Sequence, residues 1–316
     1  MAVTFGCVLF SGDPESDGRA GCDSHPCPSA EALGFHALWL ADHIVIPRAV
    51  ASAYPYAADG ASSFDPTHLY EPFSVLNFLA GCTQSIRLGT HVLIVSYRPP
   101  VYAAKVLATL DALSGGSADP GCRHRLDGRG IRSAGPRHSC AAGAVTNEYL
   151  RLLKELWTKN EVEFRGDFVH VSGIGFQPKP VQRPHPPIWI GGRSLPALRS
   201  AALPGDGWMP IGLRPLSLLG PADMANKIAH LRALLRKANL AEDAVRISFT
   251  APVVITGTPA SPRPLLQGRP EEIATDLGQY QALGVCNFNI NLPGFEIDEQ
   301  VAAMERFATD VIPLLS

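Results

Sequence analysis

One stretch constrains the fold of this chain more than any other, the largely apolar run from Gly34 to Pro47. The run begins at a glycine and ends at a proline. A continuous apolar run of this kind predicts a strand that is buried on both faces, as in a parallel sheet. Asp42 and His43 stand where this strand gives way to its loop. Because ligands and catalytic groups gather at the carboxyl ends of parallel strands, the pair is the first candidate for function. In the structural alternative, Asp42 caps a turn and His43 makes an ordinary hydrogen bond.

The composition favours one soluble domain over residues 1–316. With 46% hydrophobic and 18% charged residues, the chain suits one large core, and α/β barrels often form one domain of about 250 residues. A net charge of −2 without a basic, aromatic-interleaved run predicts no nucleic-acid partner. No apolar run reaches the ~18 residues of a membrane span, so we expect no membrane contact and a cytoplasmic location. The seven cysteines lack C-x-x-C spacing, which predicts free thiols rather than a zinc site or a disulfide frame.

The remaining chain alternates strand and helix patterns, which predicts a parallel sheet surrounded by helices. Apolar runs predict further strands at residues 3–10, 86–95, 188–190, 246–255 and 285–291. Apolar residues at helical spacing, with Pro72 limiting one start, predict helices at residues 68–80, 99–113, 147–157, 194–203, 224–238, 271–283 and 298–315. Residues 30–34 resemble a helix end with a glycine cap. The connection at residues 47–66 is long enough for an active-site lid, with a disordered excursion as the alternative.

Five motifs carry a family resemblance over most of the chain, and they occur in the family's order. They are G-F-x-x-L-W-L-A-D-H from residue 34, R-L-G-T-H-V-L from 87, A-x-L-D-x-L-S-G-G from 108, P-I-W-I-G-G-R-S from 187 and G-D-G-W-M-P from 205. Together they resemble the luciferase-like monooxygenase superfamily, and most of all its actinobacterial oxidoreductases that depend on the deazaflavin coenzyme F-420. The resemblance implies a (β/α)8 TIM barrel, a flavin or deazaflavin cofactor, a small-molecule substrate and often a homodimer.

The segment Gly191-Gly192-Arg193-Ser194 joins a buried strand to a helix. Its amides are therefore expected at a helix N-terminus, where they can hold a phosphate, and Arg193 adds a positive charge. In the resemblance this turn receives the cofactor phosphate. A plain structural turn is the alternative, because a bare G-G pair is weak evidence.

The resemblance assigns roles to two further groups of residues. Thr90, His91 and Val92 lie beneath the cofactor ring, on a strand that often carries a bulge or a non-prolyl cis peptide, here at His91–Val92. Asp42 and His43 lie at the deazaflavin face as catalytic residues. A histidine there can give or take the proton that accompanies hydride transfer near neutral pH.

The leading functional hypothesis is hydride transfer between coenzyme F-420 and a small organic substrate. An FMN-dependent monooxygenase on the same barrel is the alternative within the class, and no nicotinamide-type G-x-G-x-x-G follows a strand. A barrel made inactive by a disrupted fourth strand is a second alternative. A metal-dependent barrel hydrolase is a third, and against it the histidines show no H-x-H or H-E-x-x-H spacing.

Residues 117–143 show neither a regular spacing of apolar residues nor a recognisable turn pattern, although the family places its fourth strand here. A basic, disordered insertion is one interpretation. We favour a compensated frameshift, because these residues permit codons that encode RLIPGVGIGWMAEEFEALG when the first base is dropped. Residues 17–29, with Cys22 and Cys27, are a second candidate for the same event.

The composition of this segment also predicts its structure. A buried fourth strand here would enclose Asp119, Arg123, Arg125 or Asp127 among apolar neighbours, and each unpaired buried charge costs several kcal/mol. We therefore expect the segment to be irregular and extruded, with the neighbouring strands separated or forced together and with poor expression or activity of the chain as written.

Overall fold

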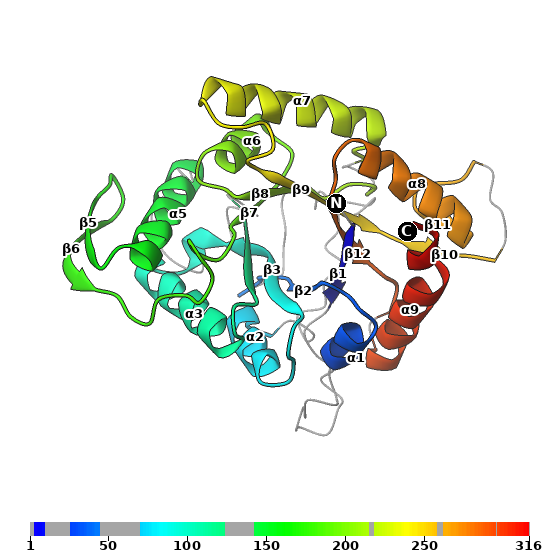
Figure 1. Cartoon of the computed structure of the whole chain (residues 1–316), viewed down its shortest axis with the longest axis horizontal. Helices are drawn as coiled ribbons and strands as arrows, with labels where there is room; N and C mark the ends of the chain where they lie inside the picture. Colours follow the sequence, from blue (N-terminus) through cyan, green and yellow to red (C-terminus); the bar gives the residue numbers. More distant parts are fainter. Residues whose placement is uncertain are drawn as a thin grey trace, which may run out of the picture.

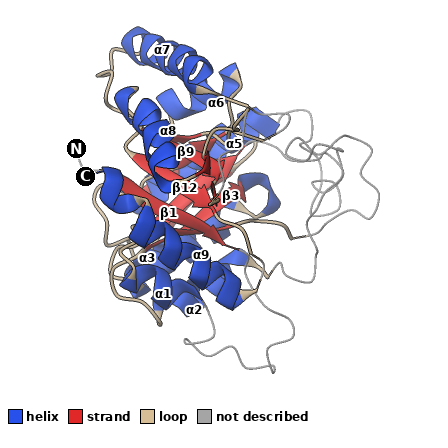
Figure 2. Cartoon of the chain, turned by 90° about the vertical axis from the view of Figure 1, so that its right-hand side faces the viewer, coloured by secondary structure: helices blue, strands red, loops and turns tan. Residues whose placement is uncertain are grey.

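In the computed structural model, parallel strands close into a barrel that is surrounded by helices (Figure 1). The structure describes residues 3–9, 26–44, 70–123, 142–214, 218–257, 262–294 and 296–315. The order of strands around the barrel is β1-β12-β9-β8-β7-β4-β3-β2. This order confirms the predicted (β/α)8 barrel. Figure 2 shows the strands enclosed between helices on opposite sides.

Most boundaries agree with the sequence predictions to within a few residues. The barrel strands are β1 (Thr4–Leu9), β2 (Ala37–Leu40), β3 (Arg87–Ile94), β4 (Ala118–Arg123), β7 (Trp189–Gly191), β8 (Gly207–Met209), β9 (Arg246–Pro252) and β12 (Asn287–Asn291). The helices are α1 (Pro26–Ala32), α2 (Pro72–Ala80), α3 (Pro100–Leu113), α5 (Ala142–Thr158), α6 (Leu195–Ala202), α7 (Pro221–Lys237), α8 (Pro270–Ala282) and α9 (Ile297–Asp310), with 3-10 turns η3 (Val95–Tyr97) and η4 (Ile312–Leu315). Several helices begin with proline, whose fixed φ suits the first turn.

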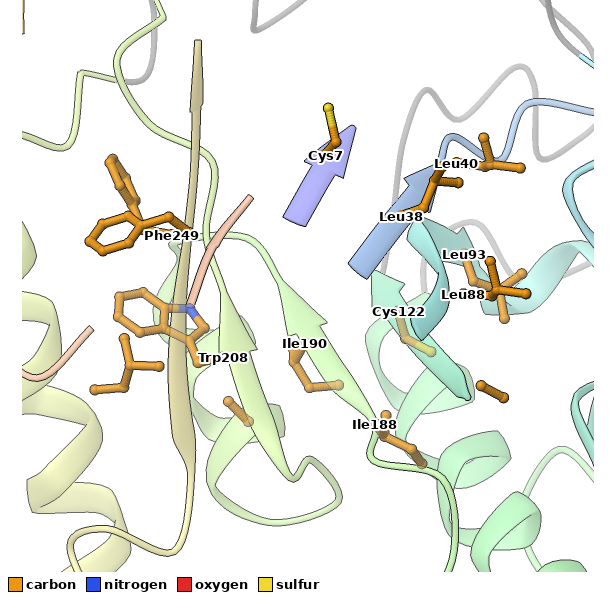
Figure 3. Packing of buried hydrophobic residues seen from close by; sticks show 14 of the residues in the cluster. Cys7, Leu38, Leu40, Leu88, Leu93, Cys122, Ile188, Ile190, Trp208 and Phe249 are labelled. Carbon is orange, nitrogen blue, oxygen red and sulfur yellow. The ribbon is translucent and has the colours of Figure 1, made fainter. Parts of the chain in front are cut away.

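The alternation of side chains along each strand separates two apolar clusters. Outward-facing residues pack beneath the helices, and Figure 3 shows Trp208 and Phe249 on the opposite side of the ring of strands from Leu88 and Leu93. Inward-facing residues form a smaller cluster inside the barrel: Ala37, Trp39, Val92, Trp189 and Met209. Because both faces of every strand are covered, the strands tolerate few polar side chains without partners.

Strand β4 corrects the prediction for residues 117–143. It lies between β3 and β7 in the closed barrel, so the expectation of an extruded segment is wrong for residues 118–123. Asp119 is 3% exposed, but Arg87 pairs with both of its carboxylate oxygens, at 2.7 and 2.5 Å. The cost of an unpaired buried charge therefore does not arise. A side chain at Gly121 would place its Cβ 2.2 Å from the Thr90 carbonyl oxygen, so a glycine is required there.

The frameshift hypothesis concerned the same segment and has no support in the structure. The closed barrel also removes the premise of the inactive-barrel alternative, since the fourth strand is present. Residues 124–141, 17–25 and 47–66, on which the other parts of these predictions fall, lie outside the described residues. Residues 26–29 belong to α1, which ends before Gly34 at φ +81°, as the glycine-cap prediction expects.

A hairpin of β5 (Glu161–Arg165) and β6 (His170–Gly175) follows α5 and was not predicted. It projects away from the barrel in Figure 1. The buried carboxylate of Glu148 on α5 accepts hydrogen bonds of 2.8 Å from the amides of Asp167, Phe168 and Val169. The helix therefore anchors the turn of the hairpin. A second pair of short strands, β10 (Val254–Ile255) and β11 (Gln267–Gly268), lies beside α8.

The free-thiol prediction is correct for four cysteines and wrong for one. Cys7, Cys27, Cys122 and Cys286 keep their thiols outside any disulfide, whereas Cys82 is disulfide-bonded. Burial raises the pKa of Cys7 to about 12, so this thiol is not a nucleophile at neutral pH. Among the described residues, no helix has the length and apolar character needed to cross a membrane, and no cluster of three His, Cys, Asp or Glu side chains could hold a metal ion.

Candidate active site

The candidate residues meet at the carboxyl-end rim of the barrel. His43 follows β2, His91 and Val92 lie in the second half of β3, and Gly191 ends β7. Since all eight barrel strands run parallel, the residues that follow them share one end of the barrel. His43 and Gly192 therefore lie at the same mouth of the barrel.

Strand β3 is irregular where the ring of a cofactor was expected. The peptide bond between His91 and Val92 is cis, as predicted, and the pairing with β4 shifts between Thr90 and Leu93. Val92 packs in the inner cluster, and His91 Nε2 lies 2.9 Å from Thr250 Oγ1 on β9. His91 and Val92 are therefore both held at the inner wall of the mouth.

Thr90 differs from its two neighbours. Its side chain is buried, and its hydroxyl donates a hydrogen bond of 2.9 Å to the carbonyl of Gly121 in β4. This contact stabilises the pairing of β3 with β4 beside the bulge. We therefore assign Thr90 to the support of the site rather than to direct cofactor contact.

The turn after β7 lies directly against the β3 bulge. A Cβ on Gly191 would lie 3.0 Å from Val92 Cγ1, although β4 separates the two strands in the sheet. Gly192 has φ +100°, a conformation that favours glycine, and its carbonyl accepts a hydrogen bond of 2.8 Å from Trp208 Nε1. The absence of side chains at both glycines lets the turn approach Val92 and Ala197 closely, and Gly192 stays half-buried at the rim.

Arg193 and Ser194 follow this turn and are exposed. Ser194 caps α6, since its hydroxyl accepts a hydrogen bond of 3.4 Å from the amide of Ala197. Leu195 begins the helix, so its amide has no acceptor within the helix. An exposed guanidinium beside the N-terminus of a helix provides what an anionic group such as a phosphate requires.

Asp42 is committed to a structural contact. Its carboxylate is buried and pairs with both terminal nitrogens of Arg98, at 2.8 and 2.9 Å, and it accepts a hydrogen bond of 2.9 Å from the amide of Ile94. All three contacts are donated to the carboxylate, so both of its oxygens are occupied in holding Arg98 and the Ile94 amide. The geometry supports the capping alternative for Asp42, whose contacts join the ends of β2 and β3 and so position the half-buried His43.

Arg98 is a residue that the sequence reasoning missed. Besides Asp42, its guanidinium holds Glu71 at 2.7 Å and lies 4.7 Å from the centre of the Phe73 ring. Burial acts to raise the pKa of Glu71, but the Ser74 amide and Arg98 outweigh it, so the pKa lies below the ordinary value. Arg98 thus joins the end of β2 to the start of α2. The available signal was an arginine three residues after the strand predicted at residues 86–95.

The rim fits a flavin-type group. An apolar surface at Val92 adjoins a backbone surface at Gly191 and Gly192, and the N-terminus of α6 with Arg193 offers an anion site next to them. His43 stands at the end of β2, on the same rim. A planar ring with a phosphate-bearing chain needs this combination of a flat wall and an adjacent anion site.

Comparisons with known proteins identify the family of this chain. Residues 28–267 match the family model described as luciferase-like monooxygenase. An uncharacterised protein of Mycobacterium tuberculosis is 30% identical over 213 residues, which are 65% of this chain and 71% of that protein. The oxygenase component of the flavin-dependent trigonelline monooxygenase of Acinetobacter baylyi is 27% identical over 168 residues, 53% of this chain and 41% of that protein.

A solved structure shares the fold over the whole chain. The coenzyme F-420-dependent tetrahydromethanopterin reductase of Methanopyrus kandleri superposes with a TM-score of 0.76 at 17% identity, and the match covers 100% of both chains. At this identity the likeness concerns the fold. A protein that depends on coenzyme F-420 therefore has the same barrel fold.

Proposed function

Because this chain belongs to the luciferase-like monooxygenase family, we propose that it is an oxidoreductase that transfers a hydride between coenzyme F-420 and a small organic substrate. The observation that carries the proposal is the contact of the Gly191–Gly192 turn with Val92 at the β3 bulge. This contact brings an apolar wall and an anion site together at one rim. A flavin-dependent relative and an F-420-dependent structural neighbour support the cofactor class.

The residues of the chain would divide the work at this rim. The deazaflavin ring, when bound, supplies the carbon that accepts or donates the hydride. Val92 and the backbone at Gly191 would support the ring, while Arg193 and the first amides of α6 would bind the phosphate. His43 would give or take the proton at the substrate oxygen, a task that suits an imidazole near neutral pH. The family resemblance adds a homodimer to the proposal.

Titration of the purified chain with coenzyme F-420 and with FMN, followed by fluorescence and absorbance, tests the cofactor. We expect saturable binding of F-420 and weaker binding of FMN. Arg193→Ala should weaken binding by about 1–3 kcal/mol, the scale of a lost hydrogen bond to a charged group. Arg199→Ala is the matched control, because Arg199 is also exposed on α6 but lies in its last turn. Equal affinity of Arg193→Ala and the unaltered chain would remove Arg193 from the site.

His43→Ala separates binding from turnover. In a screen of small alcohols and carbonyl compounds, this variant should lose roughly 10²–10⁴-fold in kcat, the contribution of a general acid or base, and keep its cofactor affinity within a few-fold. Tighter binding of FMN than of F-420, with oxygen consumed during turnover, would instead favour the FMN-dependent monooxygenase.

A further inference from the structure

Arg214 is an arginine at the rim that the proposed function does not use. After β8 the chain continues alongside β9 and then reaches Arg214. In this continuation Ile211 pairs with Thr250, and the Gly212 amide donates a hydrogen bond of 2.9 Å to the Thr250 carbonyl. The same threonine holds His91 through its hydroxyl, at 2.9 Å. The segment that carries Arg214 is therefore built onto the wall of the candidate active site.

The local backbone holds Arg214 in a defined place. A Cβ on Gly212 would lie 2.6 Å from the ring of Phe249, so only glycine allows this approach. Leu213 has φ +53°, an unusual conformation for a residue with a side chain, and its amide donates a hydrogen bond of 2.7 Å to the Leu218 carbonyl. These contacts lie next to Arg214, whose side chain reaches the end of β12.

The guanidinium of Arg214 lies on the inner side of the rim. It donates a hydrogen bond to Oδ1 of Asn291, the last residue of β12. Asn289, two residues earlier, faces the barrel interior, where its amide nitrogen contacts Ser248 and Met209. Because side chains two apart share a face of a strand, Asn291 also faces inward, and Arg214 meets it there.

The charge of Arg214 has no counter-charge among the described residues. Four other arginines with described side chains are buried or half-buried, and each has a carboxylate oxygen within 4.0 Å: Arg87, Arg98, Arg232 and Arg263. Arg214 is half-buried, and among the described residues its side chain bonds to the neutral amide of Asn291 alone. Asn291 orients the guanidinium without neutralising it, which leaves several donors in a planar fork that fits an oxyanion.

We propose that Arg214 binds an anionic group, a carboxylate or a phosphate, of the organic substrate at this rim. The proposed function enters only in the statement that the anion belongs to the substrate. Arg193, after β7, offers a separate positive charge for the cofactor phosphate. The two arginines follow different strands, so their ligands can be distinguished by mutation.

Benzoate and its neutral isostere benzamide are the probes, titrated by calorimetry at constant ionic strength with and without F-420. The full chain should bind benzoate at least about tenfold more tightly than benzamide, as expected for hydrogen bonds to a charged group. Arg214→Gln should abolish this difference, and Arg214→Lys should keep part of it. Arg151→Gln, which removes an exposed arginine from α5, should behave as the unaltered chain.

Three outcomes would overturn the proposal. The first is equal binding of benzoate and benzamide by the unaltered chain. The second is unchanged benzoate binding by both Arg214 variants, provided that they unfold as the unaltered chain does. The third is a loss of F-420 affinity in Arg214→Gln that equals its loss of benzoate affinity. The last result would assign Arg214 to the cofactor. If the chain binds neither F-420 nor FMN, the proposed function fails, while the benzoate comparison in the cofactor-free chain still decides the role of Arg214.

Discussion

The two ends of the barrel each hold a buried arginine–aspartate pair, and the pairs join different kinds of structure. At the amino end, Arg87 and Asp119 connect the first residues of β3 and β4. At the carboxyl end, Arg98 and Asp42 connect segments that leave the barrel after β3 and β2. The chemistry of the two pairs is the same, and their positions give them different consequences.

The surroundings of the two pairs show this difference. At the amino end, Gln182 bonds to Arg87, Asp111 and the Ala118 carbonyl, which closes the network within the protein. At the carboxyl end, the pair stands beside His43 on the same rim as the exposed Arg193 and the glycine turn. A closed network contributes to the stability of the fold, whereas the open end keeps polar groups that can meet a ligand.

Asp119→Ala tests the amino-end pair and has the largest expected effect on stability. Removing the carboxylate leaves the partly buried guanidinium of Arg87 without its counter-charge, which costs about 3–5 kcal/mol for a buried pair. Urea unfolding should show this loss of free energy. Cofactor affinity, measured on the fraction that remains folded, should stay unchanged.

A surface pair provides the control for this substitution. Arg306 and Asp310 lie one turn apart on α9, with side chains 51% and 40% exposed. Asp310→Ala should change the free energy of unfolding by no more than about 0.5 kcal/mol, as for other exposed pairs at this spacing. If Asp119→Ala lowered the free energy of unfolding by as little as this, the buried pair at the amino end would stabilise the fold no more than a surface pair does.

Glu71→Gln tests the ion pair of Arg98 at the carboxyl end, with a smaller expected effect on stability. The pKa of Glu71 is lowered from 4.5 in the folded chain, so its carboxylate stabilises the fold above about that pH, and this contribution is lost as the pH falls through the lowered value. Thermal unfolding from pH 6 to pH 3 should therefore depend less on pH in Glu71→Gln. Parallel pH profiles of the variant and the unaltered chain would show that Arg98 does not hold Glu71 in its charged form.

Much of the fold could be predicted from the sequence because local patterns determine it. The buried run before Asp42 and the helix that begins at Pro100 follow from apolar spacing and proline preference alone. Strand β4 could not be predicted in this way. Its Asp119 is compatible with burial only through Arg87 on β3, and no local pattern reports a partner 32 positions away.

The same limit applies to the candidate site. The cis peptide at His91–Val92 and the turn at Gly192 were predicted because the family motifs include them. The roles of Arg98 and Arg214 depend on contacts with Asp42, Glu71 and Asn291, which lie far from them in the chain. Such contacts also change the role of Asp42 from a proposed catalytic group to a positioning residue.

The most direct test of this account compares Arg98→Lys with Arg87→Lys, since each keeps a positive charge and loses the planar fork. F-420 affinity and the free energy of urea unfolding would be measured on the same samples. Arg98→Lys should bind F-420 at least about fivefold more weakly, because Asp42 also holds the Ile94 amide beside the β3 bulge. Arg87→Lys should unfold at a lower urea concentration and keep its F-420 affinity within about twofold. Equal F-420 affinities in the two variants, or weaker binding by Arg87→Lys, would contradict the placement of the cofactor site at the carboxyl end.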